Sequence, residues 1–161
     1  MRDAVGGGAG RNEVVASLIV GVVALGAVLL LAATQSVAGL HVFAIPFIAT
    51  AAVLATAPHA PLARPRAVLT AYPVAVATAL VVTAVAGPST YTAAVAAALS
   101  ITVMVLLKAP HVPAVPAAAA IGLTDPGVGY VLDPLVPGVA LVLGVALLAG
   151  RVLPGYEYRW G

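Results

Sequence analysis

The placement of charged residues restricts the fold of this chain more than any other feature of its sequence. No charged residue lies within residues 14–63 or within residues 67–107, and residues 109–150 contain only Asp125 and Asp133. A helix needs about 20 consecutive apolar residues to cross the hydrocarbon core of a bilayer. Each uncharged stretch is therefore long enough for two spans, which indicates a chain that crosses a membrane several times.

The composition excludes a water-soluble domain. Hydrophobic residues make up 63% of the 161 residues and charged residues 7%, whereas soluble domains carry about 25% charged residues. A soluble domain of this size leaves much of its surface exposed and could not hide so much apolar surface from water. The sequence therefore predicts an all-α fold, a polytopic transmembrane helical bundle that forms one domain. The absence of cysteine excludes disulfides and thiolate chemistry.

Turn-forming residues divide the apolar stretches into six segments. The predicted spans are residues 14–33, 37–57, 67–86, 90–107, 111–124 and 135–150, within a transmembrane domain of residues 14–153 that lies between a polar tail at 1–13 and an aromatic tail at 154–161. The first span is longer than a signal-peptide core, so it is expected to be retained rather than cleaved. The fifth is too short to cross about 30 Å of hydrocarbon as a helix. It is expected to be a half-helix or a broken segment that the other helices shield.

Lysine and arginine predict the orientation, because cytoplasmic loops are enriched in them. With the amino terminus in the cytoplasm, all the basic residues fall on the cytoplasmic side. They are Arg2, Arg11, Arg64, Arg66, Lys108, Arg151 and Arg159. The protein is thus expected in a prokaryotic cell membrane with both termini cytoplasmic. Tyr156, Tyr158 and Trp160 are expected to anchor the end of the last span among the lipid headgroups.

The second and fifth segments contain related sequences, which indicates an internal repeat. The hexapeptide His41-Val42-Phe43-Ala44-Ile45-Pro46 shares His, Val, Ala and Pro, in place, with His111-Val112-Pro113-Ala114-Val115-Pro116. Chance similarity in a chain rich in Ala and Val is the alternative explanation. A repeat of three spans is inverted in the membrane, because it has an odd number of crossings. Inverted repeats are typical of transporters, and short or Pro-interrupted segments in both halves mark their binding sites.

These residues resemble the HPP family of integral membrane proteins, which is named for a His-Pro-Pro motif at the start of a late, short segment. The matching stretches are His111-Val112-Pro113-Ala114, Pro46-Phe47 and Pro61-Leu62-Ala63-Arg64-Pro65-Arg66. The resemblance covers roughly residues 37–153, and Val112 replaces one proline of the family motif. Some members are associated with nitrite transport, so the resemblance implies a transporter of a small inorganic anion.

Polar residues within the apolar segments are the candidates for a solute site, because polar and ionisable groups are costly in a membrane. The candidate substrate-binding residues are His41, Pro46, Thr50, Thr70, Tyr72, Ser100, His111 and Pro113. For the two histidines the alternative is capping or anchoring at segment ends. For the Ser and Thr residues it is bonding to helix backbone. The prolines are expected to delay the helix starts, so that free backbone N–H groups face a cavity and attract an anion.

The charged residues near the segment ends each have two possible roles. Arg64 and Arg66 are topology signals, and they can also form a cytoplasmic mouth that attracts anions. Asp125 and Asp133 precede proline and read as turns, with a proton relay as the alternative.

The function expected from the sequence is a small transporter or channel-like carrier for a small solute, with an inorganic anion such as nitrite as the candidate. The alternative is a structural or accessory membrane subunit that transports nothing. The sequence has no catalytic residue set, no phosphate-binding loop and no metal-ligand spacing, so no enzyme activity, cofactor or metal is expected. The expected partners are the lipid bilayer, the solute and further copies of the chain packed through Ala and Gly, but no nucleic acid.

Overall fold

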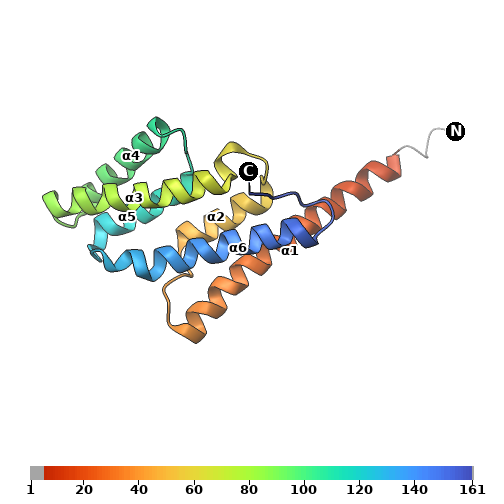
Figure 1. The fold of residues 1–161 in the computed structure, drawn as a ribbon, viewed down its shortest axis with the longest axis horizontal. Coiled ribbons are helices and arrows are strands. Elements are labelled where there is room, and N and C mark those ends of the chain that lie inside the picture. Colours follow the sequence, from red (N-terminus) through yellow and green to blue (C-terminus); the bar gives the residue numbers. More distant parts are fainter. Residues whose placement is uncertain (1–5, 161) are drawn as a thin grey trace.

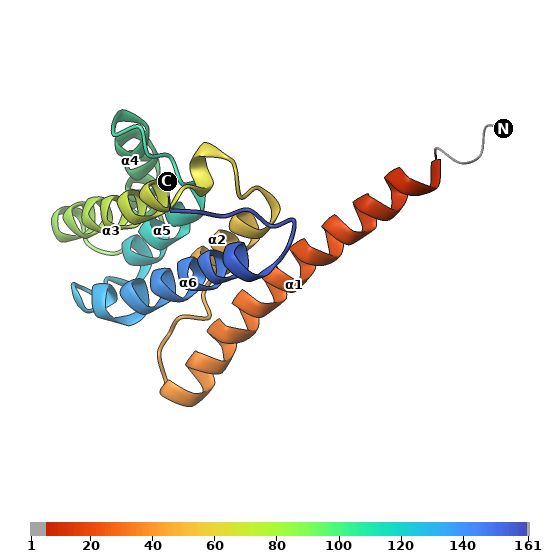
Figure 2. The same cartoon turned by 45° about the vertical axis from the view of Figure 1, so that its right-hand side comes forward.

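The computed structural model describes residues 6–160, and side chains from residue 12 onward. The described part contains helices and no strands, as predicted. The main helices are α1 (Gly6–Ala38), α2 (Ile45–Thr56), α3 (Pro65–Ala86), α4 (Thr90–Leu106), α5 (Val115–Thr124) and α6 (Val136–Val152), with short turns η1 (Pro61–Ala63), η2 (Val112–Ala114) and η3 (Val131–Leu135) before α3, α5 and α6. Figures 1 and 2 show that consecutive helices run in alternate directions.

The first helix continues through the polar residues 34–36, where a break was expected. Gln35 and Ser36 are exposed and Thr34 is half-buried, and the side-chain oxygen of Gln35 accepts a hydrogen bond from the N–H of Phe43. The helix ends instead at Ala38, before Gly39, whose φ of +71° suits glycine and whose N–H bonds the carbonyl of Gln35. Residues 39–44 are irregular, so the expected start of the second span at residue 37 is wrong.

Three helical stretches are long and apolar enough to cross a membrane by themselves: Asn12–Ala38, Pro65–Ala86 and Val131–Val152. The other apolar helices, α2, α4 and α5, are shorter. The prediction of a short fifth segment is confirmed, since α5 has only 10 residues. With 12 residues, α2 is nearly as short, so the two segments that carry the related sequences are the two shortest helices of the bundle.

The helices form two units of three. Helices α1, α2 and α6 pack on one another, and so do α3, α4 and α5, while contacts between the units run from α2 to α5 and η2 and, more sparsely, from α3 to α6. Each unit therefore contains two helices from one half of the sequence and one from the other. An inverted repeat of three spans would produce this pattern, because exchanging each helix with the one three places later turns one unit into the other.

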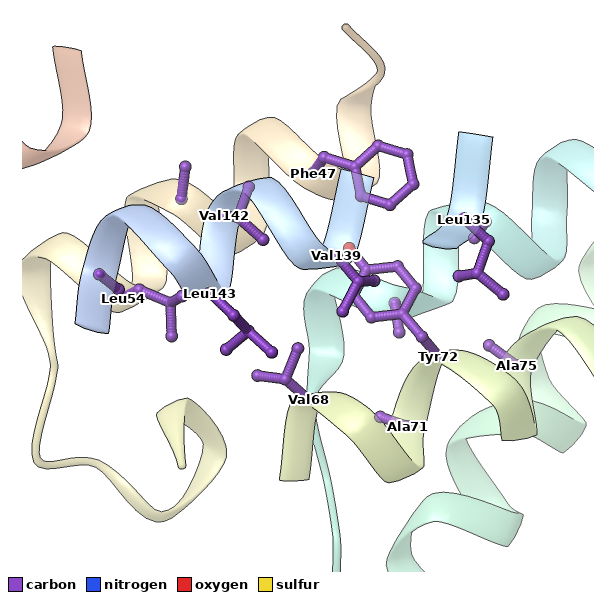
Figure 3. Packing of buried hydrophobic residues seen from close by; sticks show 14 of the residues in the cluster. Phe47, Leu54, Val68, Ala71, Tyr72, Ala75, Leu135, Val139, Val142 and Leu143 are labelled. Atoms are coloured by element: carbon purple, nitrogen blue, oxygen red, sulfur yellow. The ribbon is translucent and has the colours of Figure 1, made fainter. Parts of the chain in front are cut away.

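The interior lies where α2, α3 and α6 meet. Phe47 of α2 stacks on Tyr72 of α3 with 5.5 Å between ring centroids, and Figure 3 shows Val139 of α6 beside them. Close helix contacts depend on glycine. A Cβ at Gly138 would lie 2.7 Å from the Phe47 ring, and one at Gly122 would lie 2.5 Å from the Cα of Ala93. Small residues at such crossings are typical of helix packing in membranes.

The C-terminal segment folds back onto the bundle. Tyr156 donates a hydrogen bond to the carbonyl of Leu54, and Tyr158 donates one to the carbonyl of Ala63. Burial raises the pKa of Tyr156 to about 12, so its hydroxyl remains a donor. Both rings are buried, whereas the side chain of Trp160 is exposed. The expectation that both tyrosines anchor in the headgroups is therefore wrong, because free carbonyls near helix ends recruit them inward.

Candidate functional site

A chain of hydrogen bonds crosses the core between the two units. The Thr50 hydroxyl lies 2.8 Å from the Tyr72 hydroxyl and 2.8 Å from Nε2 of His111. Tyr72 donates to the carbonyl of Pro46, and Nδ1 of His111 lies 2.8 Å from the carbonyl of Leu62. We call these five residues the polar chain. The side chains of Thr50, Tyr72 and His111 are fully buried.

The elements that carry the polar chain place it at the seam between the units. Thr50 lies in the second turn of α2, directly after the residues that form the helix start. Tyr72 precedes Pro73 inside α3, and His111 precedes η2. The side chains thus come from α2, from α3 and from the residue before η2, so both units contribute to the polar chain. The tilted Tyr72 and His111 rings, 5.8 Å apart, add packing to the hydrogen bonds.

A groove of about 660 Å³ opens at one end of the bundle, between α2 and α5. Its walls are mostly apolar, and its polar side chains are His41, Thr124, Tyr130 and Asp133. His41 pairs with Asp133 through Nδ1 at 2.8 Å and through its backbone N–H at 2.7 Å. Burial raises the pKa of Tyr130 to about 12, so its hydroxyl is a neutral donor. Pro46, whose carbonyl ends the polar chain, also lines this groove.

A basic pocket lies at the opposite end of α2. It has a volume of about 280 Å³ and is lined by Arg64, Arg66, Lys108 and apolar residues, among them Pro110 next to His111. Arg159 shares a neighbouring pocket with Arg64, and Arg151 shares another with Arg159. The five basic residues whose side chains are described therefore gather at one end of the molecule. Arg2 and Arg11 lie outside the described side chains.

Other candidate residues lie apart from the polar chain. Ser100 is buried, but its hydroxyl donates to the carbonyl of Ala97 in its own helix. Thr70 is half-buried and has no described hydrogen bond to the polar chain. Pro113 is buried in η2, two residues after His111. The structure thus brings Pro46, Thr50, Tyr72 and His111 together and places His41 at the open end of the groove.

The expected helix starts with several free N–H groups are not found. Proline at the second position of α2 has no N–H, and the next two N–H groups both bond the carbonyl of Ala44. Helix α5 continues directly from η2, so its first N–H groups bond within that turn. The expectation of two uncapped amino termini facing a cavity is therefore wrong. Pro46 and Pro116 do line the same groove, but their helices offer it few donors.

The sequence marked Pro46 for its place near a helix start and not as an acceptor, and it did not mark Leu62 at all. The carbonyls of Leu62 and Pro46 are main-chain groups, which carry no signature in the sequence. For Asp133 the sequence indicated a turn, with a proton relay as the alternative, and its pairing with His41 was not predicted. Among the described residues no three His, Asp or Glu side chains lie close enough together to hold a metal ion.

Apolar helices around a buried polar chain define the class of this molecule, which is an α-helical integral membrane protein. The sequence model of the HPP transmembrane region matches residues 9–159. The chain therefore belongs to the HPP family of membrane proteins, and the resemblance noted from its motifs is confirmed. No curated protein and no solved structure matches the chain.

Proposed function

We propose that this protein is a small transporter that carries a small solute across the membrane, and that the solute is an inorganic anion such as nitrite. The observation that carries the proposal is the polar chain of Thr50, Tyr72 and His111 in the middle of an apolar core. Buried polar groups in a membrane protein are costly and mark solute paths. The polar chain also lies on the seam between two helix units, where inverted-repeat transporters bind their solutes.

Polar features line up along α2 from one end of the bundle to the other. The groove with His41 and Asp133 lies at its start, the polar chain follows at Thr50, and the basic pocket with Arg64 lies beyond its end. These three parts together make a path for a solute, with the polar chain closing it in the middle. An anion leaving or entering at the basic pocket would meet three cations, which raise its local concentration.

Passage requires the two units to move relative to each other. The seam is thin between α3 and α6, which contact each other sparsely, and an apolar pocket of about 250 Å³ separates them beside Tyr72 and Leu143. Rocking of one unit against the other would separate Thr50, on α2, from Tyr72, on α3. The path would then open from the groove side or from the basic side in turn, as in other transporters built from repeats.

The alternative function is an accessory subunit that transports nothing. It is favoured by the fully buried state of Thr50, Tyr72 and His111, since a closed polar chain also serves to lock two units together. The two functions differ in one measurable property, the passage of solute through the purified protein.

The test is an uptake screen of small inorganic anions, nitrite among them, into proteoliposomes that contain the purified protein. We expect uptake of at least one anion above that of empty liposomes and its loss in the variant His111→Ala. The matched control is His59→Ala, which replaces an exposed histidine outside the polar chain. Absence of uptake for every anion, or equal uptake by both variants, would contradict the proposal.

A further inference from the structure

The polar chain has more contacts than hydrogens when His111 is neutral. Its four contacts, each 2.8 Å long, join Leu62 O to Nδ1, Nε2 to the Thr50 hydroxyl, that hydroxyl to the Tyr72 hydroxyl, and Tyr72 to Pro46 O. Each contact needs one hydrogen between its two atoms. A neutral imidazole, a threonine and a tyrosine supply one hydrogen each, so one contact of the four stays empty.

The two carbonyls restrict the empty contact to one of the two that Thr50 makes. A carbonyl can only accept, so Leu62 takes the hydrogen of Nδ1 and Pro46 takes that of the Tyr72 hydroxyl. Thr50 then has a single hydrogen for two contacts, one to His111 and one to Tyr72. Two electronegative atoms at 2.8 Å with no hydrogen between them repel each other. The spacing of the polar chain therefore does not suit a neutral His111.

A second proton on the imidazole fills every contact. With a hydrogen on Nε2, His111 donates to the Thr50 hydroxyl, Thr50 donates to the Tyr72 hydroxyl, and Tyr72 donates to the carbonyl of Pro46. The three donors from Nε2 to the Tyr72 hydroxyl then point in one direction, toward the carbonyl of Pro46, while Nδ1 donates the other way, to Leu62. Chains of aligned hydrogen bonds strengthen one another.

We propose that the polar chain is a proton-binding site, with the proton held on Nε2 of His111, and that this proton accompanies the solute. The proposal rests on the proposed transport function and names its coupling ion. The proton enters from water on one side of the membrane and leaves to water on the other. No other bond forms or breaks, and His111 returns to its neutral form.

The groups around His111 explain why proton and anion would bind together. Tyr72 faces it from α3, Thr50 from α2 and the Leu62 carbonyl from η1. The neighbouring basic pocket holds only cations among its charged side chains, namely Arg64, Arg66 and Lys108. A buried cation without a counter-charge is costly, so an anion in that pocket would favour the proton. Linkage makes the effect reciprocal, and the proton favours the anion equally.

The hydrogen count gives a direct test in Tyr72→Phe. Without the tyrosine hydroxyl, two contacts remain, from Nδ1 to Leu62 and from Thr50 to Nε2, and a neutral imidazole and one threonine fill both. The extra proton is then no longer needed. Tyr156→Phe is the matched control, because it also removes a buried tyrosine hydroxyl that donates to a carbonyl, but one outside the polar chain.

The measurement is nitrogen NMR of the full chain labelled at histidine, titrated between about pH 5 and 8, where histidine changes charge. The chain has three histidines, and the signals lost in His111→Gln identify His111. We expect its Nε2 to carry a proton over part of this range. We expect Tyr72→Phe to lower the titration midpoint by about one pH unit, the effect of one net hydrogen bond, and Tyr156→Phe to leave it unchanged.

Two results would overturn the proton site: an Nε2 that stays without a proton over the whole range, or equal midpoints in Tyr72→Phe and Tyr156→Phe. Adding nitrite should raise the midpoint of the unsubstituted protein, and an unchanged midpoint would contradict the coupling to that anion. The titration alone needs no transported solute. If the midpoint falls in Tyr72→Phe and not in Tyr156→Phe, while no anion is taken up into proteoliposomes, the proposed transport function is wrong and the proton site stands.

Discussion

At the scale of the residue, Thr50 is the centre of the site. Its single hydroxyl contacts Tyr72 of α3 and His111 before η2, so one oxygen atom joins three elements. The protein contains other buried hydroxyls. That of Ser100, for example, bonds only a carbonyl of its own helix. Thr50 therefore differs from an ordinary helix threonine, because its partners lie on the other unit.

Replacing Thr50 by valine should destabilise the protein and impair transport. The shape of the side chain is kept, but Nε2 of His111 loses its partner and the Tyr72 hydroxyl keeps only the carbonyl of Pro46, which costs about 1–3 kcal/mol. Thr56→Val is the control, since the Thr56 hydroxyl is exposed and bonds only Ala52 of its own helix. Denaturant or thermal unfolding in detergent micelles measures both. Equal stabilities of the two variants would show that the polar chain contributes nothing.

The sequence predicted the members of the polar chain better than their arrangement. Thr50, Tyr72 and His111 stood out because polar groups are rare in the apolar segments. Thr70 and Ser100 stood out for the same reason, yet they lie elsewhere. The helix face on which a hydroxyl lies depends on packing, and helices apolar on all sides carry no polar stripe that would reveal it. Main-chain acceptors such as Leu62 O have no sequence signal at all.

At the scale of the element, close approach of small residues holds each unit together. Helices α4 and α5 touch where Gly122 meets the backbone of Ala93, and α2 and α6 touch where Gly138 meets the ring of Phe47. Hydropathy alone located the helices but misplaced the start of the second one. It could not show that Gly39, with its positive φ, rather than the polar residues before it, ends the first helix.

Gly122→Ala should push α4 and α5 apart. The new Cβ would lie 2.5 Å from the Cα of Ala93, and backbone atoms cannot move aside as a side-chain tip can, so we expect a loss of about 1–3 kcal/mol. Gly144→Ala in α6 is the control, because nothing lies within 4 Å of its Cβ position, and alanine favours helix. If both variants unfold at the same denaturant concentration, the two helices are not in close contact.

At the scale of the whole molecule, the two ends differ in charge. The basic residues with described side chains gather at the end that carries the basic pocket, and Asp133 lies at the end that carries the groove. The positive-inside rule predicts that the basic end faces the cytoplasm. The C-terminal segment covers this end through Tyr156 and Tyr158. Both the C-terminal segment and the basic pocket are therefore expected to face the cell interior.

Single cysteines can report this orientation without background, because the chain has none of its own. Cysteines at Ser36, Thr90 and Val128, all exposed, should react with a membrane-impermeant thiol reagent added outside intact cells. Cysteines at the exposed His59 and Glu157 should react only after the membrane is permeabilised. The reverse pattern would show that the protein has the opposite orientation in the membrane. A mixed pattern would refute six alternating crossings.

The central claim is that the solute passes through the groove between α2 and α5. Ala120 lines this groove, whereas Leu123 of α5 is exposed and does not line it. The decisive measurement is anion uptake into proteoliposomes of Ala120→Cys and Leu123→Cys before and after treatment with a bulky thiol reagent. We predict that the reagent blocks uptake by the Ala120→Cys variant only. We also predict that bound anion slows the reaction of this cysteine with the reagent. Equal uptake by the two treated variants would contradict a path through the groove.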